Sequence, residues 1–401
     1  MTASRTSQRV NAVKPSPTLA IAGRAGQLRR EGKDIASLSV GEPDFPVFAH
    51  VEAAIVEALR RGATKYTASA GTPELREAIS DWMHAEVGVR YPATQIIATA
   101  GAKQALYNAC QAVLDDGDEA VIPNPYWVSY PEMVRLAGGK PVELQLRPED
   151  GWQPREAELE RVMTDRTRVV MLGSPSNPTG AVWTLESLQG IARVLAKFPR
   201  AIVLSDDIYG RLVYGGARAV NILHAAPELV SRTLLINGCS KAYAMTGLRL
   251  GWACGPADLV AAMNKVQDAS TSNPSSLSQS AAVAALRGPQ EPVEAMRVQF
   301  EKRRGLIIGL LRKIPGVTAT EPDGAYYVFA DVSPVLGKSH RGTKVQTSVR
   351  LAEILLEEYG VAVVPGSAFG REGYLRLSFA TSEGEIRKAL DRVAQGFAGL
   401  E

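Results

Sequence analysis

The stretch NGCSKAYAMTGLRLGW, residues 237–252, places a lysine in a loop and an arginine shortly after it. Lys241 is flanked by small residues and followed by a turn-like Met-Thr-Gly, and Arg249 precedes a short apolar run. A lysine that forms an imine with an aldehyde cofactor needs little side-chain bulk around its amine, and a nearby cation can hold the phosphate of such a cofactor. Taken alone, the stretch favours a solvated surface lysine, which is the default interpretation of a lysine in a polar loop.

Two upstream motifs follow apolar runs that are typical of buried strands. SDDIY (205–209) brings two carboxylates and a tyrosine to a strand's carboxyl end, where open α/β sheets bind ligands. Asp206 is therefore a candidate partner for a protonated ring nitrogen, with a turn or helix cap as the alternative. SPSNPTG (174–180) presents Asn177, a neutral side chain that can donate a hydrogen bond, although a generic turn would have the same composition.

The composition is that of an ordinary globular protein and excludes several classes of function. The chain has 401 residues, 22% of them charged and 45% hydrophobic, with a formal net charge of +3. This length predicts two domains, or one large lobe with a small one, and the small charge gives no support to a nucleic-acid or membrane partner. Three cysteines lack metal-ligand spacing and four histidines are scattered, so no metal site is predicted. The polar start of the chain lacks a signal-peptide core, and we expect a cytoplasmic protein.

Strand-like and helical segments alternate between about residue 50 and residue 285, which predicts a mostly parallel sheet with helices on both faces. The expected strands are 95–101, 119–125, 168–175, 201–207, 233–240 and 250–256. Beyond residue 290 the pattern changes to a long charged helix over 293–314, followed by strands at 325–332 and 374–380 around a helix at 345–360. This order indicates a smaller α+β domain.

Asn177, Asp206, Tyr209, Lys241 and Arg249 occur in this order at the ends of successive strands. As a set they resemble the fold-type I pyridoxal-phosphate enzymes, specifically the class I/II aminotransferases, from about residue 10 to the end of the chain. The chain is most similar to the bacterial aspartate/prephenate aminotransferase branch. The motifs that carry this similarity are VKPSPT (13–18), VGEPDF (40–45), PYWVSYPEM (125–133) and AMTGLRLGWACGP (244–256).

The resemblance implies the α/β fold of the PLP-dependent transferases of fold type I, with a large mostly parallel α/β/α domain and a smaller α+β domain. We expect residues 1–47 to form an N-terminal segment that packs with the small domain. Residues 48–290 would form the large PLP-binding domain, and residues 291–401 the small C-terminal domain.

The resemblance also assigns cofactor contacts. Lys241 would bind pyridoxal 5′-phosphate covalently and then act as acid and base, and Asp206 and Tyr209 would complete the catalytic set. Tyr209 and Asn177 would bond to the ring oxygen. The remaining cofactor contacts would be the amides of Gly101, Ala102 and Lys103 at a helix N-terminus, the stacked ring of Trp127, Ser240, Arg249, and Tyr66 reaching across a homodimer interface. A tight turn at 99–106 and a plain packing role for Trp127 are the alternatives.

One position departs from the family pattern. The residue three before the active-site lysine is often serine, and in this chain it is Gly238. One hydroxyl contact to the phosphate would then be lost, although Ser240 or a backbone amide could replace it.

Substrate contacts follow from the same resemblance. Arg376 in YLRLSFATS (374–382) would pair with the α-carboxylate through its planar fork, unless it is an exposed strand arginine. Gly41 would let a backbone amide approach that carboxylate, next to Trp127 and Asn177. Lys14 and Lys103 match the lysines that recognise a distal carboxylate in this branch, which implies acidic substrates such as aspartate, glutamate or prephenate.

The predicted activity is therefore a ping-pong amino transfer between an acidic amino acid and a 2-oxo acid such as oxaloacetate, 2-oxoglutarate or prephenate. Another fold-type I reaction, such as an aromatic or alanine-type transfer or a β-elimination, would use the same cofactor residues. A non-catalytic regulator on this scaffold would need a DNA-binding module, and the residues before Lys14 are expected to be too few for one.

Overall fold

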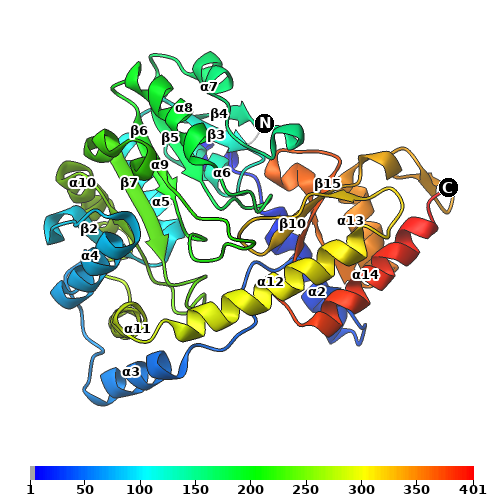
Figure 1. Cartoon of the computed structure of the whole chain (residues 1–401), viewed down its shortest axis with the longest axis horizontal. Helices are drawn as coiled ribbons and strands as arrows, with labels where there is room; N and C mark the ends of the chain where they lie inside the picture. The colour runs from blue at the N-terminus through cyan, green and yellow to red at the C-terminus, as the bar shows by residue number, and fades with distance from the viewer. Residues whose placement is uncertain (1–4) are drawn as a thin grey trace.

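The structure is a computed structural model that describes residues 5–401. It has a large lobe built on a seven-stranded sheet and a smaller lobe around a four-stranded sheet, and the long helix α12 (Glu291–Leu311) runs along one side toward the smaller lobe (Figure 1). Within residues 5–401, no helix is long and apolar enough to cross a membrane.

The seven-stranded sheet is mostly parallel, as predicted, with one antiparallel strand. Its spatial order is β2-β8-β7-β6-β5-β3-β4. The strands are β2 (Ile96–Thr99), β3 (Glu119–Asn124), β4 (Lys140–Gln145), β5 (Thr167–Gly173), β6 (Ile202–Asp206), β7 (Thr233–Gly238) and β8 (Gly251–Cys254). Only β8 runs antiparallel to its neighbours β2 and β7. The loop from β7 to β8, which carries Lys241, contains no helix that could return the chain for a parallel strand.

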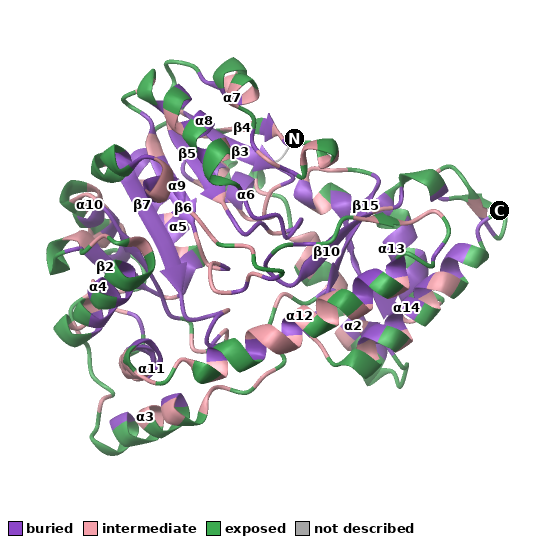
Figure 2. Ribbon diagram, in the orientation of Figure 1, coloured by how far each residue is buried: buried purple, intermediate pink, exposed green. Residues whose placement is uncertain are grey.

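Helices cover both faces of this sheet. One face packs against α5 (Ala102–Val113), α6 (Tyr130–Leu136) and α10 (Ala257–Asp268). The other packs against α4 (Pro73–Val87), α7 (Glu156–Val162), α8 (Leu185–Ala196), α9 (Ile222–Ala225) and α11 (Ser276–Arg287), with α3 (Ala49–Arg60) outside α11. The central strands are buried and the outer helices present exposed faces to solvent (Figure 2).

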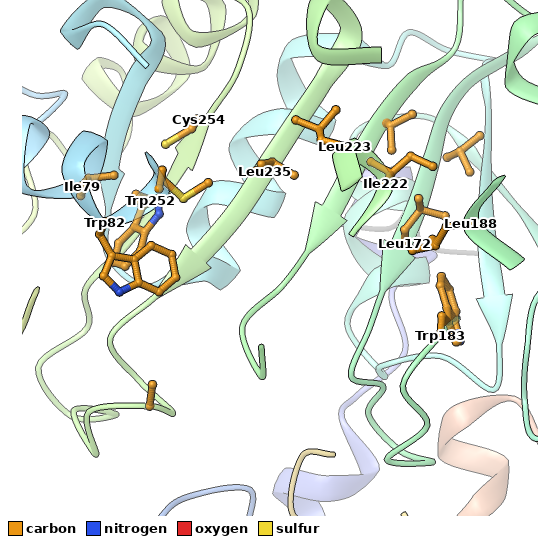
Figure 3. Close-up of a cluster of buried hydrophobic side chains, with 14 of the residues drawn as sticks. Ile79, Trp82, Leu172, Trp183, Leu188, Ile222, Leu223, Leu235, Trp252 and Cys254 are labelled. Carbon is orange, nitrogen blue, oxygen red and sulfur yellow. The ribbon is translucent and has the colours of Figure 1, made fainter. Parts of the chain in front are cut away.

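The strands alternate their side chains between the two layers. Val203 and Leu235 point into the layer with α8 and α9, whereas Leu204 and Leu234 point into the layer with α5. Because both faces are covered, the central strands are continuous apolar runs, and their polar residues come at the carboxyl ends. Figure 3 shows part of the layer that contains α8 and α9, where the rings of Trp82 and Trp252 meet edge to face with centroids 5.4 Å apart.

The smaller lobe contains an antiparallel sheet in the order β14-β15-β10-β9. These strands are β14 (Val364–Pro365), β15 (Tyr374–Ser378), β10 (Tyr327–Asp331) and β9 (Thr318–Ala319), flanked by α12, α13 (Ser348–Glu357) and α14 (Glu383–Ala398). The short hairpin β11 (Ser339–His340) and β12 (Thr343–Lys344) forms a separate two-stranded sheet, and the amide of Ser339 donates to the carbonyl of Glu401 at 2.8 Å. Short 3-10 helices occur in both lobes: η1 (Ala93–Gln95), η2 (Pro148–Asp150), η3 (Pro227–Arg232), η4 (Ser333–Val335) and η5 (Gly366–Phe369).

The N-terminal segment is tied to the smaller lobe by backbone hydrogen bonds. It contains α1 (Gln8–Asn11), α2 (Pro17–Arg30) and β1 (Ala36–Ser37), and β1 pairs in parallel with β13 (Val361–Ala362). Leu38 then accepts a hydrogen bond from the amide of Ser378 at 2.7 Å. We keep the division at residues 47/48 and 290/291 as a proposal, and the second of these positions coincides with the start of α12.

Candidate active site

A cavity of about 540 Å³ opens where the carboxyl ends of the parallel strands face the smaller lobe. Residues from three parts of the chain line it: the segment before α3, the loops of the large lobe, and the strands β10 and β15. Eleven predicted site residues line this cavity: Gly41, Ala102, Lys103, Trp127, Asn177, Asp206, Tyr209, Ser240, Lys241, Arg249 and Arg376. The alternative of unrelated turns and surface charges does not account for such convergence.

Lys241 holds its amine at the floor of this cavity. Its Nζ donates a hydrogen bond to the carbonyl oxygen of Gly41 at 2.6 Å and lies 5.7 Å from the ring centroids of both Tyr209 and Tyr326. Loss of water around the amine, reinforced by the positive charge of Arg376, lowers the pKa of Lys241 to about 8. A lysine with a depressed pKa has a larger fraction of neutral, nucleophilic amine near neutral pH.

Asp206 ends β6 and turns its carboxylate into the cavity. Burial raises its pKa to about 6, and the hydrogen bond donated by the Tyr130 hydroxyl at 2.7 Å opposes that shift. The neighbouring Asp207 points away from the cavity, because successive strand residues alternate sides. It accepts hydrogen bonds from Ser205 at 2.7 Å and Asn221 at 2.8 Å. The two carboxylates of SDDIY therefore have different surroundings, and only Asp206 faces the cavity.

Arg376 is 3% exposed, which excludes the alternative of an exposed strand arginine. Its Nη1 donates to the side-chain oxygen of Asn177 at 3.1 Å, and its Nη2 donates to the carbonyl of Ser39 at 2.7 Å. Its Nε is buried and has no hydrogen-bond partner within residues 5–401. A buried guanidinium with an unused donor at a cavity wall is suited to an anionic ligand.

The N-terminus of α5 forms the end of the cavity near Arg249. Gly101 has a φ of 85°, and a Cβ there would lie 2.5 Å from Nη2 of Arg249, so glycine permits their close approach. Arg249 donates to the carbonyls of Thr246 at 2.9 Å and Ala100 at 3.2 Å, which fixes its fork beside the helix end. The free amides of a helix N-terminus next to a fixed guanidinium make a site for a phosphate.

The glycine at the departure from the family pattern also has a packing reason. A Cβ at Gly238 would lie 2.8 Å from both the Cα of Gly251 and the carbonyl oxygen of Leu250, in the antiparallel pairing of β7 with β8. Gly251 is itself pressed against the backbone of Ala102. A serine does not fit at position 238 without movement of backbone, whereas Ser240 lines the cavity.

Lys103 and Trp127 lie together on another wall. The Lys103 amine is 4.9 Å from the ring centroid of Trp127, and burial together with the charge of Arg249 lowers the pKa of Lys103. The Trp127 ring meets that of Tyr130 edge to face at 5.5 Å. These contacts hold the indole in a fixed orientation and keep a cation beside it.

Three predicted residues do not line the cavity of their own chain: Gly101, which caps α5 beside Arg249, and Tyr66 and Lys14, which are both exposed. Tyr66 is 91% exposed in the loop between α3 and α4. Lys14 is exposed, and its backbone amide donates to the carboxylate of Glu132 at 3.0 Å. The residues that follow Lys14, Ser16 and Thr18, do line the cavity. The roles of Tyr66 and Lys14 therefore stay predictions.

Several residues that line the cavity were not predicted from the sequence, among them Tyr130, Tyr327 and Glu42. Tyr130 bonds to Asp206, Tyr327 contacts Tyr209 through its hydroxyl at 2.9 Å, and the charge of Glu42 acts on the Lys241 amine. Tyr130 stands three residues after Trp127, a spacing that brings side chains to one side of a helical turn. For Tyr327 the only available signal was the strand alternation that places it on the same face as Phe329.

Comparison with known proteins identifies relatives over nearly the whole chain. A family model described as aminotransferase class I and II matches residues 33–393. An aspartate/prephenate aminotransferase of Nitrosomonas europaea is 44% identical, with 97% of this chain and 98% of that protein covered. The aspartate aminotransferase of Rhizobium meliloti has a crystal structure that superposes with a TM-score of 0.95 at 43% identity, covering 99% of this chain and 100% of that one. The Thermus thermophilus aspartate aminotransferase with maleate gives a TM-score of 0.91 at 43% identity, with 98% and 100% covered.

Proposed function

The chain belongs to the aminotransferase class I and II family, and from that premise we propose that it transfers an amino group between an acidic amino acid and a 2-oxo acid. Aspartate and glutamate are the proposed donors, and oxaloacetate, 2-oxoglutarate and prephenate the proposed acceptors, in a ping-pong cycle. One observation carries the proposal: a lysine amine with a pKa of about 8 and a buried arginine with an unused Nε share one cavity.

The residues present fit pyridoxal 5′-phosphate. Lys241 would hold the cofactor covalently, Asp206 would pair with the ring nitrogen, and Tyr209 with Asn177 would bond to the ring oxygen. Trp127 would stack on the ring. The phosphate would be held by Ser240, Arg249 and the amides of Ala102 and Lys103 in the first turn of α5, whereas the amide of Gly101 already donates to the carbonyl of Thr99 at 2.7 Å. The glycine cradle beside Arg249 supports this fit, because a Cβ at Gly101 would fill it.

The chain's own groups would perform the binding and proton steps. When bound, the cofactor withdraws electron density from the substrate, which makes the proton on the substrate Cα removable. Arg376 would bind the α-carboxylate through its fork and so orient that Cα–H bond. The Lys241 amine, with its pKa lowered to about 8, would then take the proton from the substrate Cα and return it to the cofactor carbon.

Recognition of acidic substrates is supported by Lys103. Its amine lies in the cavity beside Trp127, and removal from water makes its charge interact more strongly with a second carboxylate. Relatives with 42–45% identity carry the names aspartate aminotransferase and aspartate/prephenate aminotransferase. The proposal includes prephenate as an acceptor, and Lys14 is the residue that the family resemblance assigns to its recognition.

We further propose that the active unit is a homodimer in the cytoplasm. Tyr66 is 91% exposed and outside the cavity of its own chain, which supports a role for it in the site of a second copy. Symmetric dimers are the most common closed assembly of identical chains. The cytoplasmic location rests on the sequence alone.

Another fold-type I reaction, such as an aromatic or alanine-type transfer or a β-elimination, is the alternative, because the cofactor residues would be shared. A screen of amino donors against 2-oxoglutarate, oxaloacetate and prephenate, with the cofactor-loaded protein, separates these possibilities. We expect aspartate and glutamate to give the highest kcat/KM. Release of a keto acid without any amino acceptor would instead identify an elimination, and a preference for apolar donors would contradict the acidic-substrate assignment.

A further inference from the structure

Two adjacent tyrosines, Tyr326 just before β10 and Tyr327 at its first position, are both 1% exposed or less. Tyr327 lines the cavity, and the ring centroid of Tyr326 lies 5.7 Å from the Lys241 amine. Their hydroxyls meet the same short segment of chain. The hydroxyl of Tyr326 donates to the carbonyl oxygen of Gly41 at 2.9 Å, and a Cβ at Gly41 would overlap the hydroxyl of Tyr327. The requirement for glycine at this position is therefore a packing requirement set by Tyr327.

The ring of Tyr327 supports Arg376. In the antiparallel pairing of β10 with β15, Tyr327 is opposite Ser378 and Phe329 is opposite Arg376. Tyr327 is thus the diagonal neighbour of Arg376 on one face of the sheet, within reach of a long side chain. The guanidinium carbon lies 4.3 Å from the ring centroid, closer than its 5.0 Å distance from the ring of Phe369. A desolvated cation at this distance is stabilised by the face of the ring.

The hydroxyl of Tyr327 makes a second, separate contact. It lies 2.9 Å from the hydroxyl of Tyr209, and either group can donate. When Tyr327 donates, the proton of Tyr209 is free to point into the cavity. The groups around Tyr209 are the rings of Tyr326 and Tyr327, the charge of Arg376 and the amine of Lys241. Burial raises the pKa of Tyr209, so its hydroxyl stays a donor.

We propose that Tyr327 is a positioning residue that links the arginine for the substrate carboxylate to the tyrosine for the cofactor ring oxygen, an inference that rests on the proposed function. Its ring face holds the Arg376 guanidinium, and its hydroxyl orients and strengthens the Tyr209 hydroxyl through a chain of two hydrogen bonds. Because the two contacts use different atoms of one side chain, two substitutions separate them. Tyr327→Phe removes the hydroxyl alone, and Tyr327→Leu removes the hydroxyl and the ring.

Two measurements on the cofactor-loaded protein report the two contacts without relying on turnover. The first is the pH midpoint of the absorbance band of the bound cofactor, and the second is the dissociation constant of maleate, a dicarboxylate without an amino group. A hydrogen bond donated to the ring oxygen stabilises its anionic form, so a weaker donor raises the midpoint. A cooperative contribution of roughly 10–30% per bond corresponds to a rise of a few tenths of a pH unit for Tyr327→Phe.

The maleate measurement should divide the variants differently. Tyr327→Phe keeps the ring, and we expect its maleate dissociation constant to stay within about twofold of the original. Tyr327→Leu should weaken maleate binding by about threefold to thirtyfold, as expected for loss of a cation–π contact at a desolvated site. The midpoint should rise in both variants. Adding Tyr209→Phe to Tyr327→Phe should raise it no further than Tyr209→Phe alone, because the second hydroxyl acts through the first.

Tyr359→Phe provides a matched control. It removes a tyrosine hydroxyl elsewhere in the smaller lobe, where Tyr359 bonds to His340 at 3.2 Å, and it should move neither measurement. Equal loss of maleate binding in Tyr327→Phe and Tyr327→Leu, or an unchanged midpoint in both, would overturn the proposal. If the unmodified protein shows no cofactor band and binds no maleate, the proposed function itself has failed. That result is distinct from a failure of the Tyr327 variants.

Discussion

The guanidinium of Arg376 donates to the side-chain oxygen of Asn177 at 3.1 Å, and this bond joins strand β15 to the loop that follows β5. The two residues are far apart in sequence and belong to different lobes. The bond places the residue proposed for the substrate carboxylate in contact with a residue proposed for the cofactor ring. If these roles hold, binding of a carboxylate at Arg376 would act directly on the surroundings of the cofactor, because one hydrogen bond separates the two residues.

Lys241→Ala should abolish amino transfer and leave the fold intact. The amine is the one nucleophile of the proposed mechanism, and its single hydrogen bond to Gly41 contributes little to packing. Steady-state assays without added amines, together with thermal unfolding, test this. Lys265→Ala, which removes an exposed lysine of α10, is the control and should keep full activity. Residual turnover above a few per cent in Lys241→Ala would refute the assignment of the lysine.

The stability of the cofactor-free protein should depend on pH through Asp206. Burial raises the pKa of this carboxyl from 3.8 to about 6, so the folded state binds a proton more tightly than the unfolded chain. Its favourable contribution is complete below about pH 4 and is lost as the pH rises through 6, up to about 3 kcal/mol. Asp207, with a pKa raised from 3.8 to about 7, adds a larger loss that begins at the same pH and continues to about pH 7.

Denaturant unfolding of the cofactor-free protein between pH 4 and pH 7.5 measures this dependence. The free energy of unfolding should fall with pH in the original protein and fall less steeply in Asp206→Asn, which keeps an acceptor for the Tyr130 hydroxyl. Identical slopes for the two proteins would show that Asp206 does not titrate in this range.

The Gly238→Ser variant should be less stable, and it should not improve the site. The added Cβ would lie 2.8 Å from the Cα of Gly251 and from the carbonyl oxygen of Leu250. Both are backbone atoms, Gly251 at the start of β8 and Leu250 directly before it. Overpacking of this kind costs typically 1–3 kcal/mol. Gly247→Ser is the matched control, because a Cβ there meets no atom within 4 Å. Equal unfolding free energies for the two serine variants would contradict the packing explanation.

The strands of the large sheet could be predicted from sequence because burial on both faces produces continuous apolar runs with polar ends. β4 was missed, since KPVELQ lies at the sheet edge, is half exposed and is not a continuous apolar run. The candidate residues at the strand ends could be predicted as well, because the end of each apolar run shows where its strand stops. Tyr327 and the carbonyl of Ser39 were not predicted. They reach the cavity through the packing of β10 and of the N-terminal segment against the large lobe, and the local sequence does not specify this packing.

Mixing Tyr66→Ala with Lys241→Ala tests whether Tyr66 serves the site of a second copy, provided that Tyr66→Ala alone is badly impaired. Tyr66→Ala lacks the tyrosine, and Lys241→Ala lacks the lysine but retains Tyr66. A mixed dimer contains one complete site if the tyrosine crosses the interface, so random mixing in equal amounts should restore about a quarter of the original activity. Sedimentation under assay conditions should show a dimer. No recovery on subunit exchange, or a fully active monomer, would exclude the shared site.

The choice of acidic substrates should depend on Lys103. Its amine lies beside Trp127 in a partly desolvated wall of the cavity, where loss of one partner of an ion pair typically costs about 2–5 kcal/mol. Lys103→Ala should therefore lower kcat/KM for aspartate and glutamate by on the order of a hundredfold or more. An uncharged donor never pairs with this cation, so its kcat/KM should change much less.

Lys14→Ala should weaken prephenate more than the smaller dicarboxylates, because Lys14 is exposed near the chain segment that enters the cavity at Ser16. Steady-state kinetics of both variants with aspartate, prephenate and an apolar donor provide the comparison. If charged and apolar substrates lose equal efficiency, the two lysines support the cofactor or the fold, and the acidic preference must come from other residues.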